Sequence, residues 1–159
     1  IGLVTHEINN GSIERMPFLS EKLWLVLPEN IECTSFSQLQ QLGFVDHPDG
    51  KKMAEKVLPL IFPEEFTGSD RMHVSAYTNS APKICHHVAK GVGYTVLDEF
   101  MVRLSPEFKK LEIVNSDSIS SDEIAYIYKG SWPLHPRNRY IIDYLNERAK
   151  HYLQQQSRF

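Results

Sequence analysis

Apolar and polar residues alternate in short blocks along the chain, and most blocks have the length of one strand or one helix. Extended apolar runs bounded by turn residues are typical of strands, and a continuous apolar run is typical of a buried one. Strands are therefore predicted at residues 1–5, 13–18, 23–27, 44–47, 74–76, 92–97, 111–114 and 124–128. Helices are predicted at residues 36–42, 51–62, 81–90, 98–104 and 136–155. Strands that alternate with helices indicate an α/β sheet with crossover connections.

Specific residues mark the ends of several predicted helices. Ser35 and Gln38 have the spacing of a capping box, and Gly43 ends the helix that they begin. Ser80 can cap another helix, whose first turn contains a proline. The helix at 51–62 is interrupted by a proline, and its expected apolar face consists of Met53, Val57, Leu60 and Ile61.

The composition is that of one soluble globular domain. The chain has 159 residues, of which 42% are hydrophobic and 23% are charged, and single domains commonly have roughly 100–150 residues. The net charge of −3 argues against a strongly basic surface for nucleic acid. No apolar run approaches the ~20 residues of a membrane span, and none resembles a signal peptide. Since the chain opens on Ile1-Gly2-Leu3-Val4 without an initiator Met, we expect it to begin inside a longer protein.

Polar side chains follow three of the predicted strands, where an α/β sheet binds its ligands. They are Thr5-His6, Asp46-His47 and Thr78-Asn79-Ser80. The last group precedes a helix, and the free N–H groups of a helix start favour a carboxylate or another anion. Two other interpretations stay open: Ser80 can act only as a helix cap, and Asp46 to Gly50 can form only a turn.

The pair Asp46-His47 also offers an acid/base pair or a pH-sensitive ligand contact. Cys85, followed by His86 and His87, suggests a nucleophile and its base, but adjacent residues on a helix point in different directions. No phosphate loop, nucleophile elbow or HExxH motif is present. The two cysteines of the chain lack metal-ligand spacing, so neither a disulfide framework nor a zinc site is expected. We therefore predict a protein that is not an enzyme and has no cofactor or metal.

Four segments in order resemble the effector-binding domain of LysR-type transcriptional regulators. Residues 88–100 are similar to the family's V-x-x-G-x-G-(hydrophobic)-x-x-L-P-E-F segment, with Asp98 in place of the usual proline. Residues 18–28, 39–45 and 133–139 are similar to three further segments, the last of which precedes the family's final amphipathic helix.

The resemblance implies a periplasmic-binding-protein-like fold of type 2. Two α/β subdomains would be joined by two crossing strands, and a small effector would bind between them. The first subdomain would contain residues 1–27 and 125–159 and be incomplete, and the second would contain residues 28–124. The ligand-binding residues implied by the family are Thr5, Phe44, Val45, Asp46, His47, Thr78, Asn79 and Ser80.

The resemblance also implies a function and partners. We expect the sensing part of a bacterial, cytoplasmic transcription regulator that binds a small, anionic metabolite and forms a homodimer. DNA would be bound only through an N-terminal domain that is missing from this sequence, and no membrane association is expected. The alternative is a solute-binding protein of the same fold that serves in transport.

Overall fold

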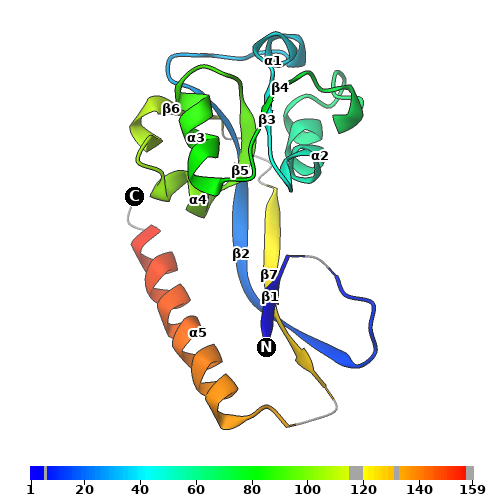
Figure 1. Cartoon of the computed structure of the whole chain (residues 1–159), viewed down its shortest axis with the longest axis vertical. Helices are drawn as coiled ribbons and strands as arrows, with labels where there is room; N and C mark the ends of the chain where they lie inside the picture. Colours follow the sequence, from blue (N-terminus) through cyan, green and yellow to red (C-terminus); the bar gives the residue numbers. More distant parts are fainter. Residues whose placement is uncertain (6, 115–119, 131–132, 157–159) are drawn as a thin grey trace. The chain divides into compact units, whose positions relative to one another are not determined.

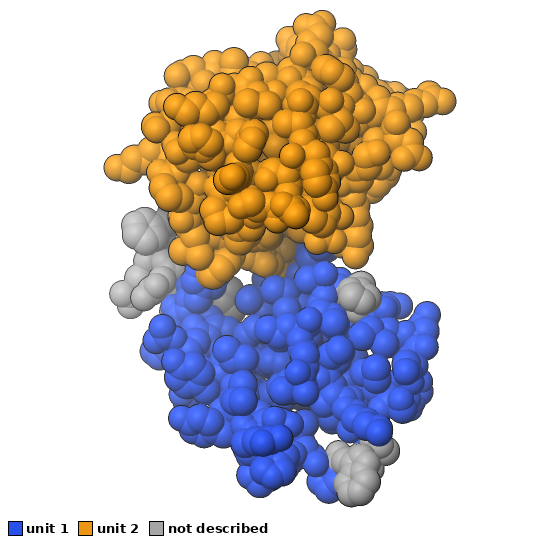
Figure 2. Space-filling model, viewed as in Figure 1, with its two compact units in different colours: residues 1–20, 122–159 blue, residues 21–121 orange. Residues whose placement is uncertain are grey.

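The computed structural model describes residues 1–5, 7–114, 120–130 and 133–156. The chain forms two compact units, one of residues 1–20 and 122–159 and the other of residues 21–121 (Figure 2). We call them unit 1 and unit 2. The family-based division at residues 27/28 and 124/125 stays a prediction about subdomains.

Unit 2 is built on a mixed sheet. Strand β3 (Phe44–Asp46) pairs in parallel with β4 (Val74–Tyr77), and a parallel bridge from Phe44 to Tyr94 connects β3 with the start of β5 (Thr95–Asp98). The second half of β2 (Ile13–Pro28) pairs antiparallel with both β5 and β6 (Leu111–Val114). This gives the order β4-β3-β5-β2-β6 across the unit.

Two apolar cores lie on the two faces of this sheet, because successive side chains of a strand point to opposite sides. In β2, Leu23, Leu25 and Leu27 belong to one core, whereas Trp24 and Val26 belong to the other. The first core is completed by α1 (Phe36–Leu42) and α2 (Gly50–Ile61). The second is completed by α3 (Ala81–Ala89) and α4 (Glu99–Leu104). Figure 1 shows α2 on one side of the strands and α3 and α4 on the other, so unit 2 is a three-layer α/β/α structure.

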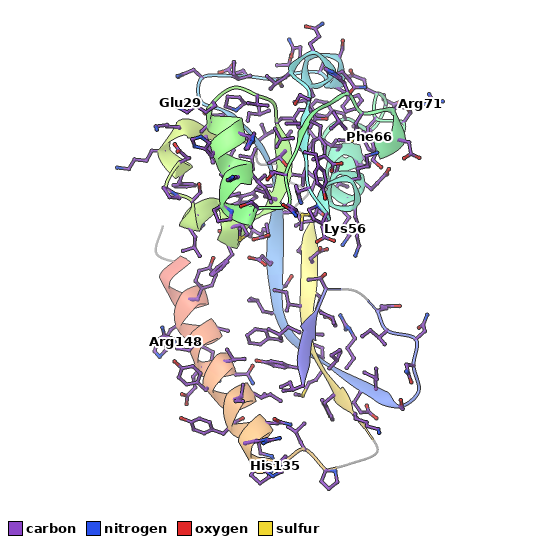
Figure 3. All side chains as sticks on the ribbon, viewed as in Figure 1. Glu29, Lys56, Phe66, Arg71, His135 and Arg148 are labelled. Atoms are coloured by element: carbon purple, nitrogen blue, oxygen red, sulfur yellow. The ribbon has the colours of Figure 1, made fainter. Side chains whose placement is uncertain are left out.

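Aromatic side chains fill the outer part of the first core. The ring of Phe66, which is labelled in Figure 3, packs edge-on against Phe36 with centroids 5.3 Å apart. Two short 3-10 turns, η1 (Ser69–Arg71) and η2 (Phe108–Lys110), connect helices to the next strands.

Two glycines allow the backbone segments before β3 and β5 to pass close together. Gly43 has φ of 84°, and a Cβ there would lie 2.7 Å from the Cβ of Ser75. A Cβ on Gly93 would lie 2.3 Å from the carbonyl oxygen of Gly43, far inside a normal contact. The parallel strands of unit 2 can therefore assemble in this way only with glycine at both positions.

Unit 1 contains β1 (Gly2–Val4), the first half of β2, most of β7 (Ser121–Lys129) and α5 (Pro136–Gln156). β1 pairs antiparallel with β7. The ring centroids of Phe18 and Tyr126 lie 4.6 Å apart, and an ion pair joins Arg15 to Glu123. The chain passes between the units twice, once along β2 and once at the start of β7, in agreement with the two predicted crossing strands.

The alternating order of strands and helices is confirmed, with corrections. The two predicted extended runs at 13–18 and 23–27 form one strand, and Leu3 of the run predicted to be buried is 53% exposed, since β1 lies at the edge of its sheet. In α2, Ala54, Val57 and Leu58 are buried, and the predicted Met53 and Ile61 pack half-buried against the same core. Leu60, predicted on this face, is instead 46% exposed.

Two further corrections concern helix and strand ends. The hydroxyl of Ser35 accepts from the N–H of Gln38, as predicted, but the Gln38 side chain accepts from Thr34 instead of completing the capping box. The strand predicted to begin at Val92 begins at Thr95. Over the described residues, no helix is both long enough and apolar enough to cross a membrane.

Removal of the Tyr94 hydroxyl is expected to stabilise unit 2. Tyr94 is fully buried, and its hydroxyl has no hydrogen-bond partner among the described residues. Burial also raises the pKa of this hydroxyl above its usual value. An unsatisfied buried polar group costs about 1–3 kcal/mol, so Tyr94→Phe should raise the free energy of unfolding by about 1 kcal/mol.

Urea denaturation followed by circular dichroism measures this change. Tyr77→Phe is the matched control, because Tyr77 is 62% exposed and loss of its hydroxyl should leave the free energy of unfolding unchanged. A Tyr94→Phe chain that is less stable than the unsubstituted one would contradict the prediction.

Candidate functional site

The strongest candidate site lies where the parallel strands of unit 2 end. Asp46 and Tyr77 are register partners at the carboxyl ends of β3 and β4, and the N–H of Thr78 donates to the carbonyl of Asp46 over 3.0 Å. Two of the three predicted groups, Asp46-His47 and Thr78-Asn79-Ser80, are thus brought to one edge of one sheet. We call the segments 46–50 and 77–81 the strand-end site.

The first side of the strand-end site is the turn between β3 and α2. The carboxylate of Asp46 accepts from the N–H of His47 over 2.9 Å. The His47 ring is buried, and its Nε2 donates to the carbonyl of Val96 over 3.0 Å. A Cβ on Gly50 would lie 2.7 Å from Asp46 Oδ1. The side chains of Asp46 and His47 therefore pack against the start of α2 where Gly50 has no side chain.

This arrangement limits what the predicted acid/base pair can do. The His47 ring is held inward by the backbone of β5, whereas the Asp46 side chain is half-buried. The turn interpretation of residues 46–50 is supported by the N–H of Gly50, which donates to the carbonyl of His47 over 2.9 Å. His47 therefore shapes the turn, and Asp46 carries the polar group at its surface.

The second side is the start of α3. The hydroxyl of Thr78 accepts from the N–H of Ser80 over 3.2 Å, and Ser80 is the N-cap residue of the helix. Its own hydroxyl makes no cap hydrogen bond, and the first turn has no acidic residue. The interpretation of Ser80 as a plain side-chain cap is therefore not supported, and a hydroxyl stays available beside the exposed Asn79.

Three other predicted ligand residues have different surroundings. Phe44 and Val45 are fully buried, one in each core, and their N–H groups donate to the carbonyls of His73 and Tyr94. Thr5 belongs to unit 1, where it follows β1 and is exposed. His6 lies outside the described residues.

The start of α2 carries two positive charges. Lys51 and Lys52 are exposed in its first turn, which has no acidic residue. A helix start normally favours negative side chains, because the partial charge of the helix is positive there. Two lysines at this end instead favour an anion from outside the helix, although Asp46 and Asp49 lie close in the sequence.

The arrangement around Cys85 does not favour nucleophilic catalysis. Cys85 is 2% exposed, and burial raises the pKa of its thiol. His86 pairs with Glu107 over 3.1 Å, and His87 Nδ1 donates to the carbonyl of Lys83 over 2.6 Å. Each imidazole thus has a partner other than the thiol, and neither activates it.

The described part of the chain offers no group of three or more His, Cys, Asp or Glu residues that could hold a metal ion. One cluster of a different kind was not predicted from the sequence. Glu21, which lies between the strands predicted at 13–18 and 23–27, is beside Asp98 and Glu99 in the folded chain. Only the pairing of β2 with β5 brings these residues together, so no local motif could have indicated it.

Comparison with known proteins supplies the family. The model of the LysR substrate binding domain matches residues 1–150. No sequence among the curated proteins matches the chain. Solved structures similar to this chain do exist. Their sequences are less than 25% identical to it, so the similarity shows a shared fold and nothing more.

Three similar structures illustrate the range. The regulatory domain of Synechocystis PCC6803 CcmR in complex with 2-PG has a TM-score of 0.69 at 17% identity, over 93% of this chain and 72% of that one. The effector binding domain of QuiR in complex with shikimate has a TM-score of 0.65 at 11% identity, over 94% and 71%. Full-length OxyR C199D from Pseudomonas aeruginosa has a TM-score of 0.64 at 19% identity, over 94% of this chain and 50% of that one.

The thiol of Cys85 is expected to be unreactive in the folded chain. Because it is buried and its pKa is raised, a thiol reagent at neutral pH should label it only as fast as the chain unfolds. Labelling of a Cys33→Ser variant, which retains Cys85 alone, measures this rate with and without urea. Rapid labelling of the folded variant would instead support the nucleophile hypothesis.

Proposed function

Because this chain belongs to the LysR substrate-binding domain family, whose model matches residues 1–150, we propose that it senses a small anionic metabolite for a transcription regulator. The predicted fold, the periplasmic-binding-protein-like type 2 fold of that family, is confirmed by the family match and the similar structures. The ligand-binding residues stay a proposal, and we argue them from the strand-end site.

The observation that carries the proposal is the Ser80 hydroxyl at the positive end of α3, which makes no cap hydrogen bond to the helix. A carboxylate bound there accepts from this hydroxyl, from the Asn79 amide and from the first backbone N–H of the helix. Pro82 has no N–H, and that of Lys83 already donates to the Ser80 carbonyl over 2.8 Å. The side chains of Asn79 and Ser80 thus supply most of the donors.

The rest of the strand-end site favours a ligand that also carries hydroxyl groups. The half-buried carboxylate of Asp46 accepts hydrogen bonds, and a hydroxyl is the donor that a small metabolite would present to it. CcmR has been solved with 2-PG and QuiR with shikimate, a hydroxylated carboxylate. We propose a hydroxylated small anion, the class to which shikimate belongs, as the ligand of this chain.

Sensing requires that the effector bind two arrangements of the protein with different affinity, because otherwise it shifts no equilibrium. The chain passes between units 1 and 2 only along β2 and at the start of β7. We propose that effector binding shifts the equilibrium between arrangements of these units. Thr5 is kept as a predicted ligand residue on the family resemblance alone.

The proposed setting is that of the family. DNA binding would belong to another domain of the whole regulator, which would act as a homodimer in the bacterial cytoplasm, and no catalysis is proposed for this domain. Transport is the less favoured alternative, since the similar structures are domains of regulators. The chain spans 72% of the CcmR regulatory domain and 50% of full-length OxyR.

Substitutions at the strand-end site should weaken anion binding without unfolding the chain. A panel of hydroxylated carboxylates, with shikimate among them, is screened by thermal shift, because a ligand that binds only the folded state raises its stability. Hydrogen bonds to a charged group contribute about 1.5–3 kcal/mol. For a compound that binds, Ser80→Ala and Asn79→Ala should therefore each raise Kd by roughly 10- to 100-fold.

Ser37→Ala is the matched control, since Ser37 is an exposed serine in the first turn of α1. It should leave Kd unchanged. If Ser80→Ala and Asn79→Ala both bind the compound as tightly as the control does, the strand-end site is not where the anion binds. Thr5→Val in the whole regulator, read by effector-dependent transcription, separately tests the family-based residue.

A further inference from the structure

Two acidic side chains converge on the first turn of α4. Glu21 is the first residue of unit 2 on β2, and its Oε1 accepts from the N–H of Phe100 over 3.1 Å. Asp98, at the end of β5, accepts from the N–H of Met101 over 2.8 Å through its Oδ1. Since Leu23 is the register partner of Asp98, the pairing of β2 with β5 holds both carboxyl groups at one helix start.

The other charged groups around Glu21 do not neutralise this pair. Glu99, buried in the same turn, adds a third carboxylate, and it pairs with Arg103 over 2.7 Å. Arg103 also lies over the ring of Trp24, 5.0 Å from its centroid. The guanidinium group thus interacts with Glu99 and Trp24 rather than with Glu21.

The remaining neighbours of Glu21 among the described residues of unit 2 add no compensating charge. Lys22 follows Glu21 on β2 and is exposed, and successive side chains of a strand point to opposite faces. On the other side of β2, Leu23 donates to the carbonyl of Ser120 over 2.9 Å. The unit 2 residues described there, Ser120 and Ser121, carry no charge.

These surroundings favour the protonated form of Glu21. Burial is the largest cause, and the charge of Asp98, a hydrogen bond with the Asp98 side chain and the charge of Glu99 act in the same direction. Only the hydrogen bond from Phe100 favours the ionised form. Together they raise the pKa of Glu21 to about 7, so its carboxyl group titrates near neutral pH.

We propose that Glu21 is a proton-responsive contact at the point where β2 enters unit 2. Protonated Glu21 donates its hydrogen to the carboxylate of Asp98 while it accepts from Phe100. When the proton leaves to solvent, the hydrogen bond between Glu21 and Asp98 is lost, and the repulsion of the two carboxylates at the start of α4 destabilises folded unit 2. This device is formed by residues outside the strand-end site, so it goes beyond the proposed function.

The sign of the pH dependence follows from the direction of the shift. A carboxyl group with a higher pKa in the folded than in the unfolded chain binds more protons when folded. Its contribution to stability is fully present below the usual glutamate pKa and is lost as the pH rises to about 7. Most acidic residues that form ion pairs have the opposite dependence.

Urea unfolding of the chain at about pH 5 and pH 8 tests the proposal. The urea midpoint of the unsubstituted chain should fall between pH 5 and pH 8. This fall should exceed the fall of the Glu21→Gln midpoint by about 0.5–1 M. The amide of glutamine is neutral at both pH values and retains an oxygen that can accept from Phe100. Glu14→Gln, an exposed glutamate on the same strand, is the matched control and should keep the pH dependence of the unsubstituted chain.

A second measurement needs no substitution. Carbon-detected NMR of the side-chain carboxyl groups gives the titration midpoint of Glu21 in the unsubstituted chain, which is expected near pH 7. A Glu21 midpoint near that of an ordinary glutamate, or equal pH dependence in Glu21→Gln and Glu14→Gln, overturns the proposal.

Discussion

The burial of one segment of β2 on both of its faces is the constraint on which the structure of unit 2 depends. Residues 23–27 pair with β5 on one side and with β6 on the other, and alternate side chains enter the two cores. A continuous apolar run is required here, because a polar residue at any of these positions would be buried without a partner. The helices on both faces therefore pack against a single central strand.

The position of the strand-end site follows from this layering. With β2 antiparallel to β5, and β5 parallel to β3 and β4, the carboxyl ends of three strands reach the same edge of the sheet. Gly43 and Gly93 allow the segments before β3 and β5 to approach, and Gly50 leaves room for the side chains of Asp46 and His47. The geometry of the site is thus a consequence of backbone packing, and its surface residues, Asn79 and Ser80 among them, would select the proposed ligand.

The pattern of neighbouring residues was sufficient to predict the features that depend on neighbouring residues, such as the order of strands and helices. Apolar runs gave the order of the elements, and strand ends followed by polar residues gave Asp46 and Ser80, because parallel strands end at a common edge. The outward position of Leu60 was missed because residues 53, 57, 60 and 61 share helical spacing, whereas the face that packs on the core is centred on Ala54, Val57 and Leu58. Glu21 was missed because its surroundings come from the register of β2 with β5, over 70 residues away in sequence, and no short motif encodes such a contact.

The two proposals also act on one another through the sheet. Asp98 ends β5 at the same edge at which β3 and β4 end in Asp46 and Tyr77, so the charge of Glu21 develops at the edge that holds the proposed anion site. Charges separated by about a Debye length, ~8–10 Å, are only partly screened. Under the two proposals, loss of the Glu21 proton would disfavour an anion at the strand-end site, and by reciprocal linkage a bound anion would raise the proton affinity of Glu21. Proton and effector would then favour the same state of the domain, although each is held by different residues.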